Sequence, residues 1–158
     1  MGKKKKKAPS NIIVKNKRAG FEYSFLEYFE AGLSLQGWEV KSLRQGKISF
    51  NESFVLIKNS EAFLHGAHIT PLLSASSHVD ADPRRYKKLL LHSNEISHLI
   101  GAIERKGLTL VPRMLYWKNG KVKLLMSLAK GKKLHDKRQA EKQKDWDRNK
   151  QRMLKIHN

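Results

Sequence analysis

Apolar side chains recur at the spacing of an amphipathic helix between residues 93 and 107. The repeating positions, at i, i+3, i+4 and i+7, are Ile96, Leu99, Ile100 and Ile103. Ser93 stands before them as a capping residue, Glu95 places a negative charge in the first turn, and Gly107 follows as a stop signal. The pattern predicts a helix over this stretch.

A second, shorter helix is expected over residues 24–31. Ser24 and Glu27 have the spacing of a capping box, and Phe25 and Phe29, four residues apart, share one helical face. The glycine that follows is a stop signal.

Strand-like alternation predicts two hairpins. The first joins residues 54–58 to 61–65 through an Asn59-Ser60 turn, and the second joins residues 108–118 to 121–128 through Asn119-Gly120, a type I′ signal. In the last strand one face is apolar (Val122, Leu124, Met126 and Leu128) and the other carries Lys121, Lys123 and Ser127.

The remaining stretches give shorter predictions. Residues 12–14 and 89–91 are expected to be strands, and the chain from Leu33 on is strand-like, with a bulge or bend at Gly37. Residues 70–83 have the composition of a loop. The fold class expected from these elements is mainly β with flanking helices: an OB-like closed antiparallel barrel of about six strands and about three short helices.

Three regions follow from this reading. Residues 1–10 form a Lys-rich arm that is expected to be disordered, residues 11–128 form the barrel, and residues 129–158 form a basic tail. The apolar residues of the tail make no continuous stripe, so a helix there would have little to bury. We therefore expect a tail that is disordered when free and becomes ordered on RNA.

The distribution of charge along the chain indicates which class of molecule it binds. The chain holds 33 Lys and Arg against 14 Asp and Glu, a net charge of +19. Residues 1–18 contribute eight basic residues and no acid, and residues 129–158 contribute eleven against four. Basic excess at both ends is typical of proteins that bind a polyanion, and we expect that polyanion to be nucleic acid.

Composition also limits the kinds of site and the cellular location that we expect for the chain. There is no cysteine, no apolar run long enough for a membrane span, and no apolar region typical of a signal peptide, so a cytoplasmic protein is expected. His65 and His68 have odd spacing on a predicted strand and would face opposite ways, while His78, Asp80 and Asp82 lie in a loop. Neither group predicts a metal site, and no catalytic residue or cofactor is expected.

A basic run with one aromatic residue suggests direct RNA contact. It consists of Arg84, Arg85, Tyr86, Lys87 and Lys88. The tyrosine could stack on a base while the cations meet phosphates. The alternative is a solvated basic turn before a buried strand. Asp82-Pro83, just upstream, has the form of a helix start.

Three long segments resemble one known family. They are NKRAGFEYSFLEYFEAGLSLQGWEVKSLRQGK, DPRRYKKLLLH and GLTLVPRMLYWKNGKVKLLMSLAKGKKLHDKR. Together they are similar to the SsrA-binding proteins, or small protein B, of bacterial trans-translation, with the resemblance running from about Asn11 to Asn158. The resemblance implies a non-enzymatic protein that binds the tRNA-like domain of transfer-messenger RNA (tmRNA) and delivers it to stalled ribosomes. Elongation factor Tu and alanyl-tRNA synthetase would be partners through the RNA.

The resemblance also implies roles for particular residues. The surface that grips the tRNA-like domain would include Asn16, Lys17, Arg18, Glu30 and Leu90, beside the basic run at 84–88. Contacts with the decoding centre and the message channel of the small ribosomal subunit would come from Lys130, Gly131, Lys132, Lys133, His135, Asp136, Lys137, Arg138, Trp146, Met153 and Leu154. A general OB-type RNA chaperone or ribosome-associated factor is the second hypothesis, and a nuclease that uses the histidines is the third.

Overall fold

The computed structural model of the chain describes residues 11–74 and 80–156. Its strands are β1 (Ile12–Lys15), β2 (Tyr23–Leu33), β3 (Ile48–Ser49), β4 (Phe54–Lys58), β5 (Glu61–His65), β6 (His68–Ile69), β7 (Lys87–Leu90), β8 (Thr109–Lys118) and β9 (Lys121–Gly131). Its helices are α1 (Ala19–Glu22), α2 (Gly37–Arg44), α3 (Ser93–Lys106) and α4 (Leu134–Ile156). The predicted lysine arm and His78 lie outside the described residues.

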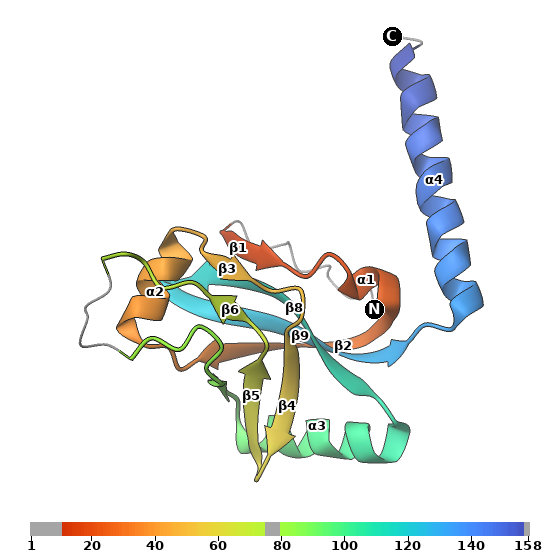
Figure 1. The fold of residues 1–158 in the computed structure, drawn as a ribbon. Coiled ribbons are helices and arrows are strands. Elements are labelled where there is room, and N and C mark those ends of the chain that lie inside the picture. Colours follow the sequence, from red (N-terminus) through yellow and green to blue (C-terminus); the bar gives the residue numbers. More distant parts are fainter. Residues whose placement is uncertain (1–10, 75–79, 157–158) are drawn as a thin grey trace.

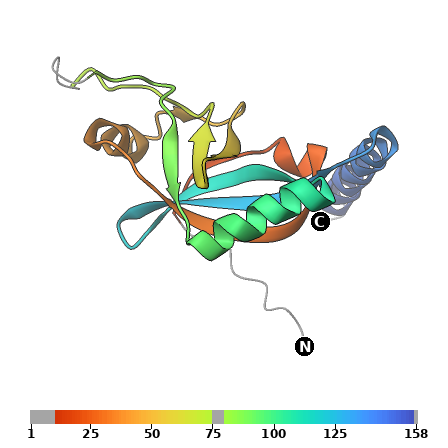
Figure 2. The ribbon, with the colours of Figure 1, turned by 90° about the horizontal axis from the view of Figure 1, so that it is seen from below.

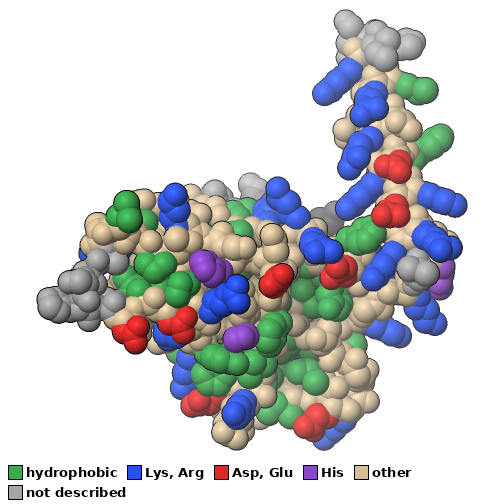
Figure 3. All heavy atoms as spheres, viewed as in Figure 1, with side chains coloured by type: hydrophobic (Ala, Val, Ile, Leu, Met, Phe, Trp, Pro, Cys, Tyr) green, Lys and Arg blue, Asp and Glu red, His purple; other side chains and the backbone are tan. Residues whose placement is uncertain are grey.

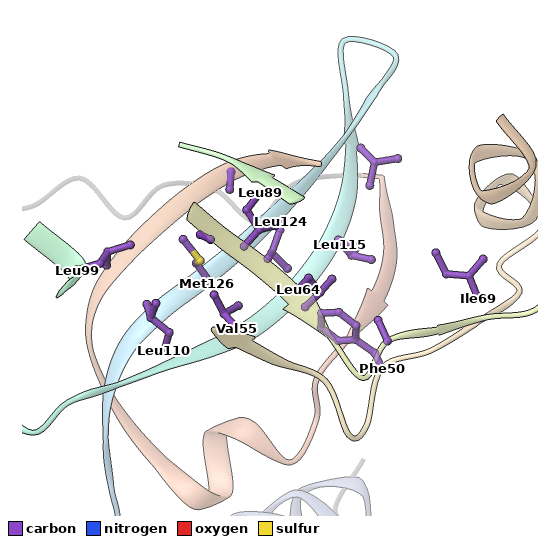
Figure 4. Close-up of a cluster of buried hydrophobic side chains, with 14 of the residues drawn as sticks. Phe50, Val55, Leu64, Ile69, Leu89, Leu99, Leu110, Leu115, Leu124 and Met126 are labelled. Carbon is purple, nitrogen blue, oxygen red and sulfur yellow. The ribbon is translucent and has the colours of Figure 1, made fainter. Parts of the chain in front are cut away.

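Seven of the strands form one antiparallel sheet in the order β1-β8-β9-β2-β7-β5-β4, and β3 pairs with β6 in a separate two-stranded ribbon. The sheet curls around an apolar core, with α3 running beneath it (Figures 1 and 2). Side chains from different strands meet in this core, among them Leu64, Leu115, Leu124 and Met126 (Figure 4). A mainly β, antiparallel fold with several helices is therefore confirmed.

The predicted closure into a barrel is not confirmed. Strands β1 and β4 stand at the two ends of the sheet, and within residues 11–74 and 80–156 no ladder of backbone hydrogen bonds joins them. Strand β4 lies close to β8, so the two halves of the curled sheet approach each other through side chains. The nine strands and four helices of the described chain also exceed the six and three expected.

The helix predicted over residues 24–31 is wrong. This stretch belongs to β2, which pairs with β9 from Tyr23↔Gly131 to Gly32↔Lys123. A register shift between Phe25 and Glu27 inserts a bulge, and this extra residue breaks the strict alternation of sides. Because of the bulge, the spacing of Phe25 and Phe29 in this strand resembles the spacing of residues on one face of a helix.

Helix α2 replaces the bend expected at Gly37. The backbone N–H of Gln36 donates to Glu39 Oε1 over 2.9 Å, so the glutamate supplies the cap that opens this helix. The helix predicted at Asp82-Pro83 is likewise wrong. There, Asp82 Oδ1 accepts from the backbone N–H of Arg84 at 3.0 Å and closes a turn.

Both predicted hairpins are confirmed, and so is the helix that ends at Gly107. Asn59, Ser60 and Asn119 have positive φ, as the two-residue turns require. Gly107 has φ +62° at the end of α3, whose N-cap is His92 where Ser93 was expected. Leu89 lies in β7, and β9 extends to Gly131, beyond the expected end of the barrel at Leu128.

The described part of the tail is helical from Leu134 on. Disorder of the tail in the absence of RNA stays a prediction. Helix α4 spans 23 residues and projects away from the sheet (Figure 1). Its sequence contains no glycine or proline and is rich in Lys, Arg and Gln, which have high helix propensity. One hydrogen bond within the helix, from Gln143 Nε2 to Asp147 Oδ1 at 3.1 Å, links residues four apart.

Candidate nucleic-acid interface

The outer face of the sheet brings Glu30, Leu90 and Lys123 together. Gly32 of β2 lies opposite Leu90 of β7 on one side and Lys123 of β9 on the other. A Cβ at Gly32 would lie 3.4 Å from Leu90 and 3.6 Å from Lys123 Nζ, so both side chains lie directly beside this position. Glu30, two residues earlier in β2, faces the same way. Leu90 is 56% exposed in spite of its apolar side chain.

Side chains of β8, two strands along the same sheet, hold the Glu30 carboxylate. The Tyr116 hydroxyl donates to Glu30 Oε2, and Lys118 Nζ lies 2.9 Å from Oε1 and 3.2 Å from Oε2. The Tyr116 hydrogen bond, with Lys118 and Lys123 nearby, lowers the pKa of Glu30 and keeps it ionised. Burial and the contact with Glu30 raise the pKa of Tyr116, so its hydroxyl remains a donor. The carboxylate is thus a fixed acceptor on an open surface.

Three of these neighbours were missed from the sequence as functional residues: Tyr116, Lys118 and Lys123. The alternation of β9 did indicate that Lys123 points away from the core. No local pattern links Glu30 to Tyr116, because the two are 86 positions apart.

The side chain of Asn16 forms hydrogen bonds to the backbone of this chain. Its Nδ2 donates to the Pro112 carbonyl at 3.0 Å, and its Oδ1 accepts from the Ala19 backbone N–H at 3.2 Å. These bonds fix the entry to α1. Lys15 lies in register with Met114, Leu125 and Glu30 across three successive strand pairs, so Asn16 lies about 15 Å from Glu30. Lys17 and Arg18 are exposed beside it.

Arg113 extends this side of the face. Its guanidinium carbon lies 3.5 Å from the Phe25 ring centroid and 5.7 Å from that of Tyr28, so the cation sits against two aromatic rings. Tyr28 itself is exposed. This arrangement presents both a charge and an aromatic surface between Asn16 and Glu30.

The basic run at 84–88 divides between two faces. Arg85 and Lys87 point inward to Glu39, which is fully buried: Arg85 Nε lies 3.2 Å from Glu39 Oε1 and Lys87 Nζ lies 3.8 Å from Oε2. Lys87 is only 1% exposed, and burial lowers its pKa although Glu39 opposes the shift. These two cations are therefore poorly placed to meet RNA, contrary to the sequence-based expectation.

The other three members of the run face outward. Lys88 pairs with Glu61 at 3.1 Å on the surface, while Arg84 and Tyr86 are exposed. Tyr86 lies directly before β7, and from it to Leu90 exposed and buried residues alternate, so Tyr86 and Leu90 lie on the same side of the sheet.

The tail begins on the sheet before it becomes helical. Lys130 and Gly131 are still paired with β2, and the Lys132 backbone N–H donates to the Glu22 carbonyl at 2.9 Å. Lys132 Nζ reaches the Gly20 carbonyl at 3.1 Å, and Lys144 Nζ lies 5.6 Å from the Phe21 ring centroid. Helix α1 thus anchors the base of the tail.

The outer part of the tail carries exposed apolar side chains. They are Trp146, Met153 and Leu154. Residues seven apart lie about 20° apart around a helix, so Trp146 and Met153 share a face. Near the outer end of α4, hydrophobic side chains project on the side opposite a row of basic ones (Figure 3). Lys133, His135 and Arg138 are exposed near its start, whereas Lys137 is half-buried.

Neither a metal centre nor a membrane-spanning helix emerges from the described chain. Over residues 11–74 and 80–156 there is no group of three His, Asp or Glu side chains placed to hold a metal ion. His65 and His68 lie on different strands, β5 and β6. None of the described helices is long and apolar enough to span a bilayer.

Comparison with known families decides the assignment. The family model described as "SmpB protein" matches residues 13–156, almost the whole chain. The chain belongs to the SmpB family. Family relatives named "SsrA-binding protein" include one from Alkalilimnicola ehrlichii, 55% identical over 152 residues, which span 96% of this chain and 95% of the relative. Another, from Chromohalobacter salexigens, is 54% identical over 157 residues, 99% of this chain and 100% of the relative.

A solved structure agrees with this family membership. It is described as "tmRNA-SmpB: a journey to the center of the bacterial ribosome" and is 46% identical, with a TM-score of 0.61. The similarity covers 77% of this chain and 85% of that one.

Proposed function

We propose that this chain binds the tRNA-like domain of tmRNA and delivers it to stalled ribosomes for trans-translation. The observation that carries the proposal is the match to the SmpB family over residues 13–156. The open face with Glu30, Leu90 and Lys123 is the site on this chain that suits such an RNA.

Each of these side chains can recognise a different part of the RNA. The ionised Glu30 accepts hydrogen bonds from base or ribose donors, which are exposed in loops of folded RNA. Leu90 offers apolar contact to a base or sugar beside it. Lys123, Lys17 and Arg18 meet phosphates, and Arg113 adds a cation at the other end of the face.

The tail has a separate role in the proposal. The start of the tail lies near the decoding centre of the small subunit, where codon–anticodon pairing is absent. The residues placed there are Lys130, Gly131, Lys132, Lys133, His135, Asp136, Lys137 and Arg138. Helix α4, about 35 Å long, then enters the empty message channel. Trp146, Met153 and Leu154 are its anchors there, and its many cations face ribosomal RNA.

The proposed protein partners are those that act on tmRNA. Elongation factor Tu and alanyl-tRNA synthetase act on the charged end of tmRNA, and the chain meets them through that RNA in the cytoplasm. The chain supplies binding and no catalytic step. Ordered surfaces for two RNAs, one on the sheet and one on the tail, are sufficient for this role.

A titration tests the RNA specificity. The full chain is titrated at about 0.2 M salt, where binding by charge alone is much reduced. Its two ligands are the tRNA-like domain and an unstructured RNA of equal length. We expect the tRNA-like domain to bind much more tightly, and we expect Glu30→Ala to abolish the preference.

The second hypothesis, a general RNA chaperone, predicts the opposite result. A general RNA chaperone would bind both RNAs equally and would lose affinity for both with the same salt dependence. Equal binding by the unaltered chain would therefore overturn the proposal in favour of the chaperone.

A further inference from the structure

Four aromatic rings gather on the outer side of β4, β5 and the start of β7. The imidazole of His65 stacks on Tyr86, with ring centroids 4.0 Å apart and planes 26° apart. Phe54 meets His65 edge-on at 5.0 Å, and Phe63 meets Tyr86 edge-on at 6.4 Å. We call these four residues the aromatic platform. Hydrophobic, basic and histidine side chains adjoin one another over this region (Figure 3).

The platform is open to solvent. Tyr86 is 52% exposed and Phe54 is 46% exposed, although both are large aromatic side chains. His65 stacks on one face of the Tyr86 ring, and the half of this side chain that remains exposed is open to a partner. Stacked rings with a free face are the feature that single-stranded nucleic acid binding proteins use to hold bases.

The buried charges beneath the platform fix its orientation. Arg85 and Lys87, on either side of Tyr86, both point inward to Glu39, so the side chain between them must point outward. Arg85 Nη1 also donates to the Tyr86 carbonyl at 3.1 Å, and Lys87 Nζ donates to the Arg85 carbonyl at 2.8 Å. Tyr86 is therefore held in place before any partner arrives.

A groove runs alongside the platform. It has a volume of about 440 Å³ and is lined by Phe54, His65, Gly66, His68 and Arg84, together with Ser49, Asn51 and Glu52. Arg84 is exposed, and its guanidinium forms no ion pair in the described part of the chain. One acid, Glu52, faces these basic and aromatic side chains. The size suits one nucleotide.

The platform is continuous with the face that carries Leu90. Tyr86, directly before β7, and Lys88 and Leu90 within it are exposed in alternation with buried residues, and four strand residues span about 13 Å. This distance is about two nucleotides of extended single strand, so one RNA can touch both places.

We propose that the aromatic platform and Arg84 form a second contact for the tmRNA, which holds one unpaired nucleotide. The base stacks on the free side of Tyr86 next to Phe54, and Arg84 holds its phosphate in the groove. The inference rests on the proposed function, because the RNA is the one that binds the Glu30 face. It adds a subsite specific for an unstacked base.

Three substitutions of Tyr86 test the stacking. The full-length chain is titrated with the tRNA-like domain at about 0.2 M salt, and each variant is first checked for an unchanged melting temperature. We expect Tyr86→Phe to keep the affinity, and Tyr86→Leu and Tyr86→Ala to lose roughly 5- to 100-fold. Leu73→Ala, which alters a fully exposed apolar residue away from the platform, is the control and should bind normally.

Arg84→Gln tests the phosphate contact. It should lower the slope of log affinity against log salt by about one, the effect of one lost phosphate contact. The same variant should leave the discrimination between RNA sequences unchanged.

The outcomes separate the two proposals. If the unaltered chain prefers the tRNA-like domain and Glu30→Ala removes that preference, but Tyr86→Leu binds within twofold of normal, the platform is not an RNA contact. A loss with Tyr86→Phe equal to that with Tyr86→Leu would assign the effect to the hydroxyl and overturn stacking. If the unaltered chain shows no preference, the proposed function itself fails.

Discussion

The Tyr116 hydroxyl of β8 donates a hydrogen bond to the carboxylate of Glu30 in β2, although these two strands do not pair with each other. Strand β9 lies between them, and its Lys123 side chain is near the same carboxylate. The contact fixes the acceptor on the proposed RNA-binding face. Tyr116 is thus a positioning residue that acts on RNA through Glu30.

Tyr116→Phe is expected to weaken binding of the tRNA-like domain about fivefold, the effect of one lost hydrogen bond of about 1 kcal/mol. The change removes the hydroxyl and keeps the ring, so the sheet should be undisturbed. Titration of the full chain measures the affinity. Tyr23→Phe, which alters a tyrosine hydroxyl that has no hydrogen bond in the described chain, is the matched control.

The same variant has a pH signature. The Tyr116 hydrogen bond lowers the pKa of Glu30, so its contribution to folding is present above the ordinary carboxyl pKa and is lost as pH falls through the lowered value. In Tyr116→Phe the Glu30 pKa should rise, which carboxyl NMR measures directly. The stability difference between the variant and the unaltered chain should shrink in acid. An unchanged Glu30 pKa would contradict the positioning role.

The buried glutamate at position 39 is expected to be important for stability. Glu39→Gln keeps the shape and the helix cap but leaves Lys87 buried without its counter-charge. Removing one partner of a buried ion pair costs about 3 to 5 kcal/mol of unfolding free energy, which urea denaturation measures.

The control for that variant is another Lys–Glu pair. Glu61→Gln breaks the exposed contact with Lys88, and surface pairs contribute about 0 to 1 kcal/mol. Equal losses in the two variants would show that Glu39 does not act through burial.

The sequence predicted the parts of the fold that depend on local chemistry. Both hairpins followed from turn residues, since Asn59 and Asn119 tolerate positive φ, and α3 followed from its helical period and Gly107. Strand β2 was mistaken for a helix because Ser24 and Glu27 also suit a capping box. Only pairing with β9, far along the chain, selects the strand.

The sequence named some residues of the candidate site but not their arrangement, and it missed Tyr116, Lys118 and Lys123. Glu30 and Leu90 came from family resemblance, and the structure brings both to one face beside Lys123. Arg85 and Lys87, assigned to RNA from the basic run, point to Glu39, which lies on a helix that the sequence did not predict. Charge alone indicates a binding surface, but burial decides which charges reach it.

Gly66→Ala is expected to destabilise the chain by about 2 kcal/mol or more. Gly66 has φ +78°, which is unfavourable for a residue with a side chain, and a Cβ there would lie 2.3 Å from the Glu52 carbonyl oxygen. Gly101→Ala is the matched control, because Gly101 lies within α3 with nothing near its Cβ position. That variant should gain about 0.5 to 1 kcal/mol. Thermal denaturation compares them, and equal effects would contradict the clash.

Gln143→Pro is expected to separate the two proposed roles of the chain. Proline in a helix interior costs about 3 kcal/mol or more, so α4 should break near its middle. The tail contacts α1, at Glu22 and Phe21, so the break should not disturb the RNA-binding face around Glu30. We expect affinity for the tRNA-like domain within twofold of normal and loss of peptide tagging on stalled ribosomes.

Gln143→Ala is the control, because alanine favours the helix and removes only the bond to Asp147. It should bind and tag as the unaltered chain does, and circular dichroism should show its helix content retained and that of the proline variant reduced. Normal tagging by a chain with a broken α4 would mean that the message channel needs no continuous helix. The tail would then act through charge alone, since the cations remain after the helix is lost.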